Sequence, residues 1–138
     1  MSLMDEYVTD LAMCSAFIME GICDYESRKS PSGEYQRGCW DGGCGKDQFM
    51  LSRGLPVAKI VTFCMQFITY KNLWDEVKGG VFHYEVTTLV GYSLAAGKND
   101  EELREEIIDR VLEFIFGEDV EAQEACHPEL AEWVYRSL

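Results

Sequence analysis

Basic residues are scarce in this chain of 138 amino acids, which has 12 lysines and arginines against 25 aspartates and glutamates and a net charge of −13. The imbalance is concentrated in residues 99–138, which hold thirteen of the acidic residues and three of the basic ones. Direct binding of DNA or RNA needs a basic surface for the phosphates, so it is not expected. An acidic surface suits a solvated protein or one that meets a basic partner.

Long uncharged stretches are also absent. The longest one near the middle, residues 60–70, is too short to span a bilayer. The acidic start, MSLMDEYVTD, lacks the basic region of a secretory signal. We therefore expect a cytoplasmic protein without a membrane partner, in which the six cysteines are mostly thiols. Residues 1–3 precede a second methionine and can be the remnant of an added tag.

Proline is absent from residues 4–26, and apolar residues such as Val8, Ala12 and Ile18 recur there at helical spacing. We therefore predict a helix at 4–26. A second segment, 56–78, is apolar on most sides and is predicted to be a central helix that ends at Gly79-Gly80. Residues 81–96 are rich in strand-forming residues but long for a strand, and their apolar face fits a helix. We predict a helix there.

Further helices are predicted at 47–53, with Asp47 as N-cap and Gly54 as terminator, and at 100–116, capped by Asn99 or Asp100 and ended by Gly117. Two short helices, 118–126 and 128–137, complete the chain. The predicted fold class is all-α: one compact domain, residues 1–138, of five to six helices around the central helix at 56–78.

Regular spacing is missing from the glycine-rich loop at 27–46. Its motif RGCWDGGCGKD lacks the residues of a phosphate-binding loop, because Trp40 replaces the first glycine and Asp47 replaces the serine or threonine after Lys46. We expect Trp40 to dock on the helices, over Met13 and Phe17, with Asp41 and Lys46 beside it as a recognition surface. Without that cover, Met13 and Phe17 would form a homo-oligomer interface.

Histidine is scarce too, with two in the chain. Cys39 and Cys44 have a spacing that can bind zinc, but a structural site needs two further ligands. His83 and the adjacent pair Cys126-His127 are the remaining candidates, so the metal set Cys39, Cys44, Cys126 and His127 is weak and no cofactor is expected. Cys14, Cys23 and Cys64 lie among apolar residues and are interpreted as core residues.

Two classes of function fit these observations. The first is a non-enzymatic protein-binding or regulatory module that meets a basic partner, as small acidic proteins of phages and mobile elements often do. The alternative is a thiol- or metal-dependent protein centred on Cys39 and Cys44. No nucleophile and base stand out as a pair, so the sequence favours a binding protein over an enzyme. The predicted acidic face consists of Glu102, Glu105, Glu106, Asp109 and Glu113.

Overall fold

The structure is a computed structural model that describes residues 3–29, 48–76 and 82–136. Within these ranges the chain forms five α-helices and no strand, which confirms the predicted all-α class. Two short helices flank the second α-helix: a π-helical turn, η1, precedes it and a 3-10 turn, η2, follows it. The elements are α1 (Leu3–Lys29), η1 (Met50–Gly54), α4 (Leu55–Tyr70), η2 (Trp74–Glu76), α5 (Phe82–Ala95), α6 (Asp100–Phe116) and α7 (Val120–Arg136).

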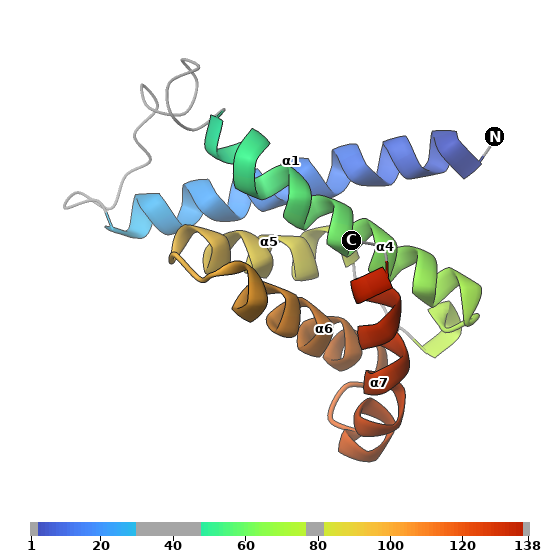
Figure 1. Cartoon of the computed structure of the whole chain (residues 1–138). Helices are drawn as coiled ribbons and strands as arrows, with labels where there is room; N and C mark the ends of the chain where they lie inside the picture. Colours follow the sequence, from blue (N-terminus) through green and yellow to red (C-terminus); the bar gives the residue numbers. More distant parts are fainter. Residues whose placement is uncertain (1–2, 30–47, 77–81, 137–138) are drawn as a thin grey trace.

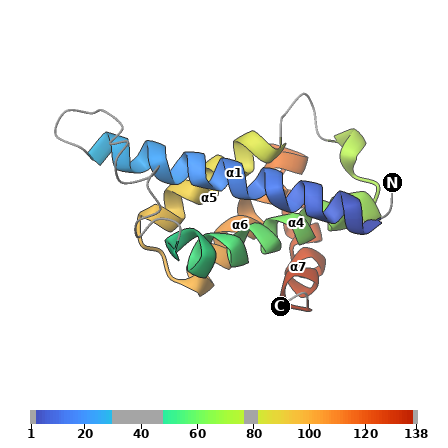
Figure 2. The same cartoon turned by 90° about the horizontal axis from the view of Figure 1, so that it is seen from above.

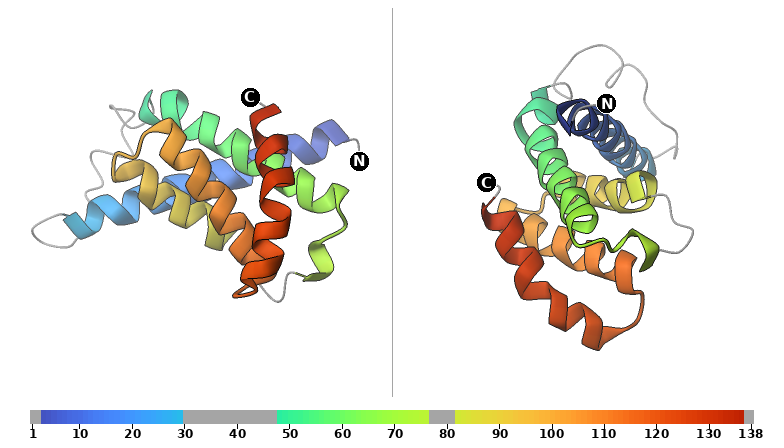
Figure 3. Two further views of the ribbon diagram at one scale, coloured as in Figure 1. Left: turned by 60° about the horizontal axis from the view of Figure 1, so that its bottom comes forward. Right: turned by 90° about the vertical axis from the view of Figure 1, so that its right-hand side faces the viewer.

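The long helix α1 lies at one side of the bundle and α7 at the other, with α4 and α5 between them (Figures 1 and 3). Seen from above, α1 extends over α5 and α4 (Figure 2). The most extensive pairing joins α1 to α5, while α4 packs against α1, α6 and α7. A bundle organised around α4 therefore stays a prediction. The largest fully buried side chains come from all five helices and include Ile18, Ile68, Leu94, Ile107 and Leu130.

The buried face of α1 agrees with the predicted one in part, because Ile18 is buried as predicted. Cys14, Ile18 and Ile22 are buried, whereas Val8 is 57% exposed and Ala12 is exposed. The prediction was wrong at Val8 and Ala12 because apolar residues occur on several sides of α1, so spacing alone did not select the face that meets α5. Helix α1 also continues to Lys29, which corrects the predicted start of the loop at residue 27. The rest of the loop, 30–47, lies outside the described residues.

Helix α4 ends at Tyr70, eight residues before the predicted end of the segment 56–78. The cause is Asn72, whose φ of 55° is left-handed. The N–H of Asn72 donates to the carbonyl of Thr69, and the N–H of Leu73 donates to that of Ile68. This arrangement satisfies the last carbonyls of the helix as a left-handed glycine would, so asparagine supplies the stop. The predicted stop at Gly79-Gly80 lies outside the described residues.

The helix predicted to end at Gly54 instead continues into α4 and is described from Gln48 onward. Gly54 has ordinary helical angles (φ −71°, ψ −41°) and is buried. The N–H of Leu55 donates to the carbonyl of Met50, five residues back, which makes a π-helical turn. Pro56 follows without an N–H of its own, and the wider turn lets the helix pass this position. The predicted cap Asp47 lies outside the described residues.

The C-terminal segment is one helix, α7, rather than two short ones separated by Pro128. Proline removes one helical hydrogen bond, but α7 packs against α6 and α4. Leu130 and Val134, beyond the proline, are buried in that contact. The helices predicted at 81–96 and 100–116 are confirmed. Asn99 caps α6 by accepting from the N–H of Glu102, and Gly117, with φ 62°, ends it.

Candidate functional site

The predicted acidic face lies on α6, where Glu102, Glu105, Asp109 and Glu113 are exposed. Exposed acidic residues continue on α7, which follows after a short turn. Within the described part of the chain, Asp109 and Glu113 have no ion-pair partner. Their charges are therefore available to a binding partner. The exposed acids of α7 are Glu121, Glu124, Glu129 and Glu132, of which Glu129 pairs with Lys71 and Glu132 with Arg136.

The prediction that Glu106 belongs to this face is wrong. Its side chain is 13% exposed, and its carboxylate accepts hydrogen bonds from Ser93 Oγ, Lys98 Nζ and Arg110 Nε. Burial raises the pKa of Glu106, but the hydrogen bonds from Lys98, Ser93 and Arg110 outweigh it and hold the pKa below its usual value. Glu106 thus joins the end of α5 and the following turn to α6, a structural role that the helical pattern did not reveal.

Glu105 is also partly engaged inside the molecule. The hydroxyl of Tyr135 on α7 donates to Glu105 Oε1 at 3.1 Å, and that hydrogen bond raises the pKa of Tyr135. His127 Nε2 lies 3.9 Å from Glu105 Oε2, so the two side chains form an ion pair when His127 is protonated. The carboxylate remains half exposed at this α6–α7 contact. Glu105 is therefore a poorer candidate for partner binding than Asp109 or Glu113.

The predicted metal and loop sites fall largely outside the described residues, which include none of Cys39, Cys44, Trp40, Asp41 and Lys46. The remaining metal candidates, Cys126 and His127, lie half-buried on α7. Burial raises the pKa of the Cys126 thiol, which disfavours the thiolate that metals bind. Among the described side chains, no group of three or more histidines, cysteines or carboxylates is placed to hold a metal ion.

Cys14 and Cys64 are core residues, as predicted, because neither is exposed to solvent. Burial raises the pKa of each thiol to about 12. Cys14 Sγ lies 3.8 Å from Met65 Sδ, which places it in the contact between α1 and α4. Cys23 is only half-buried. Thiols held protonated in this way are poor nucleophiles, so Cys14 and Cys64 have a packing role.

The surface predicted to form an oligomer contact is partly covered by another helix of the same chain. Phe17 packs its ring edge-to-face on Tyr84 of α5, with the ring centroids 5.7 Å apart. Met13 is 42% exposed. Phe17 therefore has a cover other than Trp40 or a second subunit, and a homo-oligomer through Met13 and Phe17 stays a prediction.

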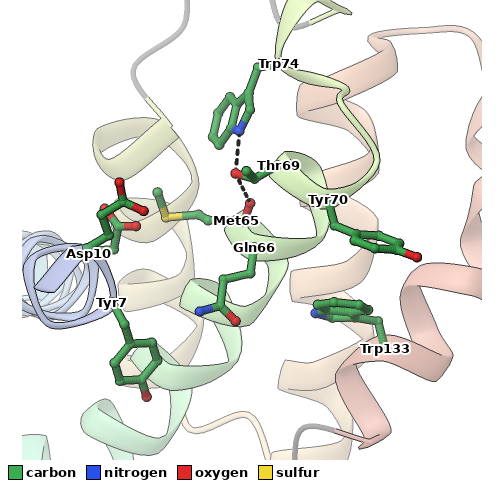
Figure 4. A pocket seen from close by; sticks show the side chains of 9 residues that line it. Tyr7, Asp10, Met65, Gln66, Thr69, Tyr70, Trp74 and Trp133 are labelled. Atoms are coloured by element: carbon green, nitrogen blue, oxygen red, sulfur yellow. Dashed lines mark hydrogen bonds between the residues drawn. The ribbon is translucent and has the colours of Figure 1, made fainter. Parts of the chain in front are cut away.

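A pocket of about 370 Å³, which the sequence reading missed, lies between α1, α4, η2 and α7. Figure 4 shows Tyr7 and Asp10 on one side of it, Trp74 beyond Thr69, and Tyr70 beside Trp133. We call it the aromatic pocket, because four of its nine lining residues carry aromatic rings. The lining residues are Glu6, Tyr7, Asp10, Met65, Gln66, Thr69, Tyr70, Trp74 and Trp133.

Both indole N–H groups of the aromatic pocket are bonded within the protein. Trp74 Nε1 donates to Thr69 Oγ1 at 2.8 Å, and Trp133 Nε1 donates to the carbonyl of Phe63 at 2.9 Å. Trp133 also stacks on Tyr70, with ring centroids 5.6 Å apart and planes 27° apart. These contacts fix the orientation of the rings before any ligand arrives. The indole N–H groups are therefore already used within the protein, and one face of Trp133 is covered by Tyr70.

Two carboxylates, those of Glu6 and Asp10, stand at the α1 side of the aromatic pocket. Asp10 Oδ1 lies 3.5 Å from His83 Nε2, which allows an ion pair with a protonated histidine but forms no hydrogen bond. Glu6, Tyr7 and Asp10 share one side of α1 because they are separated by helical spacing. That spacing was visible in the sequence, but nothing in it indicated that Trp74 and Trp133 would come to the same place.

Comparisons with protein-family models, with curated proteins and with solved structures found no match to this chain. Within its described residues, no helix is long and apolar enough to cross a membrane.

Proposed function

We propose that this protein is a non-enzymatic binding module that recognises a basic protein through the acidic outer surface of α6, continued on α7. The observation that carries the proposal is the exposure of Asp109 and Glu113 without an ion-pair partner among the described residues. The proposal includes a cytoplasmic location, as we expect from the sequence.

Charge balance supports this assignment. Like charges one helical turn apart, such as Asp109 and Glu113, weaken a helix by a few tenths of a kcal/mol, because they repel each other. A basic partner removes that repulsion on binding and speeds association through long-range attraction. Glu106, by contrast, is already neutralised by Lys98 and Arg110 and is not part of the proposed surface.

The proposal is tested by affinity capture with the wild-type chain and with the double variant Asp109→Lys, Glu113→Lys. The control is Glu26→Lys combined with Glu85→Lys, which reverses two exposed acids on α1 and α5 and changes the net charge equally. We expect a basic protein that the wild type and the control retain and the α6 variant loses. Equal retention by all three proteins would contradict the assignment of the face.

The thiol- or metal-dependent alternative rests on Cys39 and Cys44, which lie outside the described residues. Elemental analysis of the purified protein tests it. Stoichiometric zinc, lost when both cysteines are replaced by serine, would favour this alternative over a binding module without a cofactor.

A further inference from the structure

We propose that the aromatic pocket binds an alkylammonium group, the chemistry shared by small quaternary amines and by lysine side chains. The site is separate from the acidic face of α6, and the proposal does not depend on that face being functional. It rests on three features of the pocket: oriented rings, two carboxylates and a described lining without lysine or arginine.

The rings are the first feature. Cations bind over the faces of tryptophan and tyrosine because the π electrons make those faces negative, and tryptophan binds most strongly. Trp74 and Trp133 both line the aromatic pocket, and each is held by an internal hydrogen bond from its indole nitrogen. A pocket whose rings are already fixed loses little side-chain entropy when it closes around a cation.

The carboxylates of Glu6 and Asp10 are the second feature, because they supply full negative charges to the same cavity. An ammonium group there can lie against an aromatic face and near an anion at once. The volume of about 370 Å³ is in the range of small-ligand sites, which is roughly 300–1,000 Å³. It is large enough for a methylated ammonium with part of its alkyl chain.

The third feature is that the described residues lining the pocket include no lysine or arginine. The nearest one along the chain, Lys71, directs its ammonium to Glu129 Oε1 on α7, at 2.7 Å. An anionic ligand would therefore meet two carboxylates without a lysine or arginine to compensate them among the described lining residues. A neutral apolar ligand would use the rings but leave the carboxylates without a partner, so the charge distribution favours a cation.

The test compares choline with 3,3-dimethylbutan-1-ol, a neutral molecule of the same shape, by calorimetric titration and by tryptophan fluorescence. We expect choline to bind at least about tenfold more tightly, because only the cation gains from the π faces and the carboxylates. Equal affinity for the two molecules, or binding of neither choline nor a lysine derivative, would overturn the proposal.

Two exposed positions allow the site to be altered with little effect on folding. Tyr70 is 73% exposed and Glu6 is exposed. We expect Tyr70→Leu and Glu6→Gln each to weaken choline binding roughly threefold to tenfold. Glu26→Gln, on the same helix but outside the pocket, is the matched control and should bind as the wild type does. A similar loss in all three variants would contradict binding at this pocket.

The source of the ammonium group is distinguished by a second titration with Nα-acetyl-lysine methylamide and its trimethylated form. Tighter binding of choline assigns the site to a small quaternary amine. Tighter binding of a lysine derivative assigns it to a protein side chain. Charge reversal of Asp109 and Glu113 should leave either affinity nearly unchanged, which separates this proposal from the one for the α6 face.

Discussion

Gly21 of α1 and Gly91 of α5 meet backbone to backbone. A Cβ atom added at Gly21 would lie 2.2 Å from the carbonyl oxygen of Thr88, and one added at Gly91 would lie 2.3 Å from that of Ile18. Backbone atoms cannot move aside as a flexible side chain can. The two glycines therefore set the close approach of α1 and α5, the most extensive helix pair in the structure.

We expect Gly21→Ala and Gly91→Ala each to lower the free energy of unfolding by about 1–3 kcal/mol or more, because the added methyl group forces the helices apart. Helix propensity works the other way, favouring alanine by about 1 kcal/mol, so a net loss identifies packing as the cause. Urea denaturation measures the change. Ala12→Leu, at an exposed position on α1, is the control and should change stability little. Unaltered or increased stability in both glycine variants would contradict the close contact.

Glu106→Gln should destabilise the protein by roughly 1–3 kcal/mol near neutral pH, because charge-assisted hydrogen bonds from Lys98 and Arg110 are weakened at a mostly buried site. Asp109→Asn, at an exposed position on the same helix, should change stability little. Equal effects of the two substitutions on stability would contradict a structural role for Glu106 and would indicate that it faces solvent as Asp109 does.

The effect of Glu106 should also depend on pH. Its pKa is lowered in the folded protein, so its contribution to stability is present above the ordinary value of 4.5 and is lost as the pH falls through the folded value. We expect the stability difference between the wild type and Glu106→Gln to shrink in acid. Denaturation curves at pH 7 and at pH values below 4.5 test this. A stability difference that stays constant, or grows, in acid would contradict a stabilising role of the ionised Glu106 carboxylate.

Pro128 lies inside α7 and is exposed, so Pro128→Ala should stabilise the protein. Alanine restores the missing N–H and favours the helix by up to about 3 kcal/mol, with a smaller gain where the backbone has adapted to proline. A rise in Tm by differential scanning calorimetry would agree with one continuous helix. A fall would indicate that the proline ends a helix, as the sequence suggests.

The sequence predicted which segments are helical but less well where they end. Asn99 and Gly117 were recognisable as the boundaries of α6 because their residue types strongly favour those positions. Asn72 was missed because asparagine adopts the left-handed conformation less often than glycine does, and Gly79-Gly80 offered a stronger signal nearby. Pro128 was wrongly predicted to break the helix, because the packing of α7 on its neighbours cannot be inferred from the local sequence.

The candidate sites were predictable only where one helix carries them. The acidic residues of α6 follow from helical spacing, yet the inward position of Glu106 depends on Ser93 and Lys98, whose approach needs the turn between two helices. The aromatic pocket joins Tyr7, Tyr70 and Trp133 from three helices. Its formation depends on how α4 lies between α1 and α7, and no local sequence pattern indicates that arrangement.

The most direct test of the proposed function measures how salt changes the affinity for the captured basic partner. Titrations at several salt concentrations compare the wild type with Asp109→Lys, Glu113→Lys. We predict that wild-type affinity falls steeply as salt rises, because exposed charges are screened beyond about 8 Å at physiological ionic strength, and that the variant binds weakly at every concentration. Equal affinities for the two proteins, with no dependence on salt, would contradict recognition through the acidic face of α6.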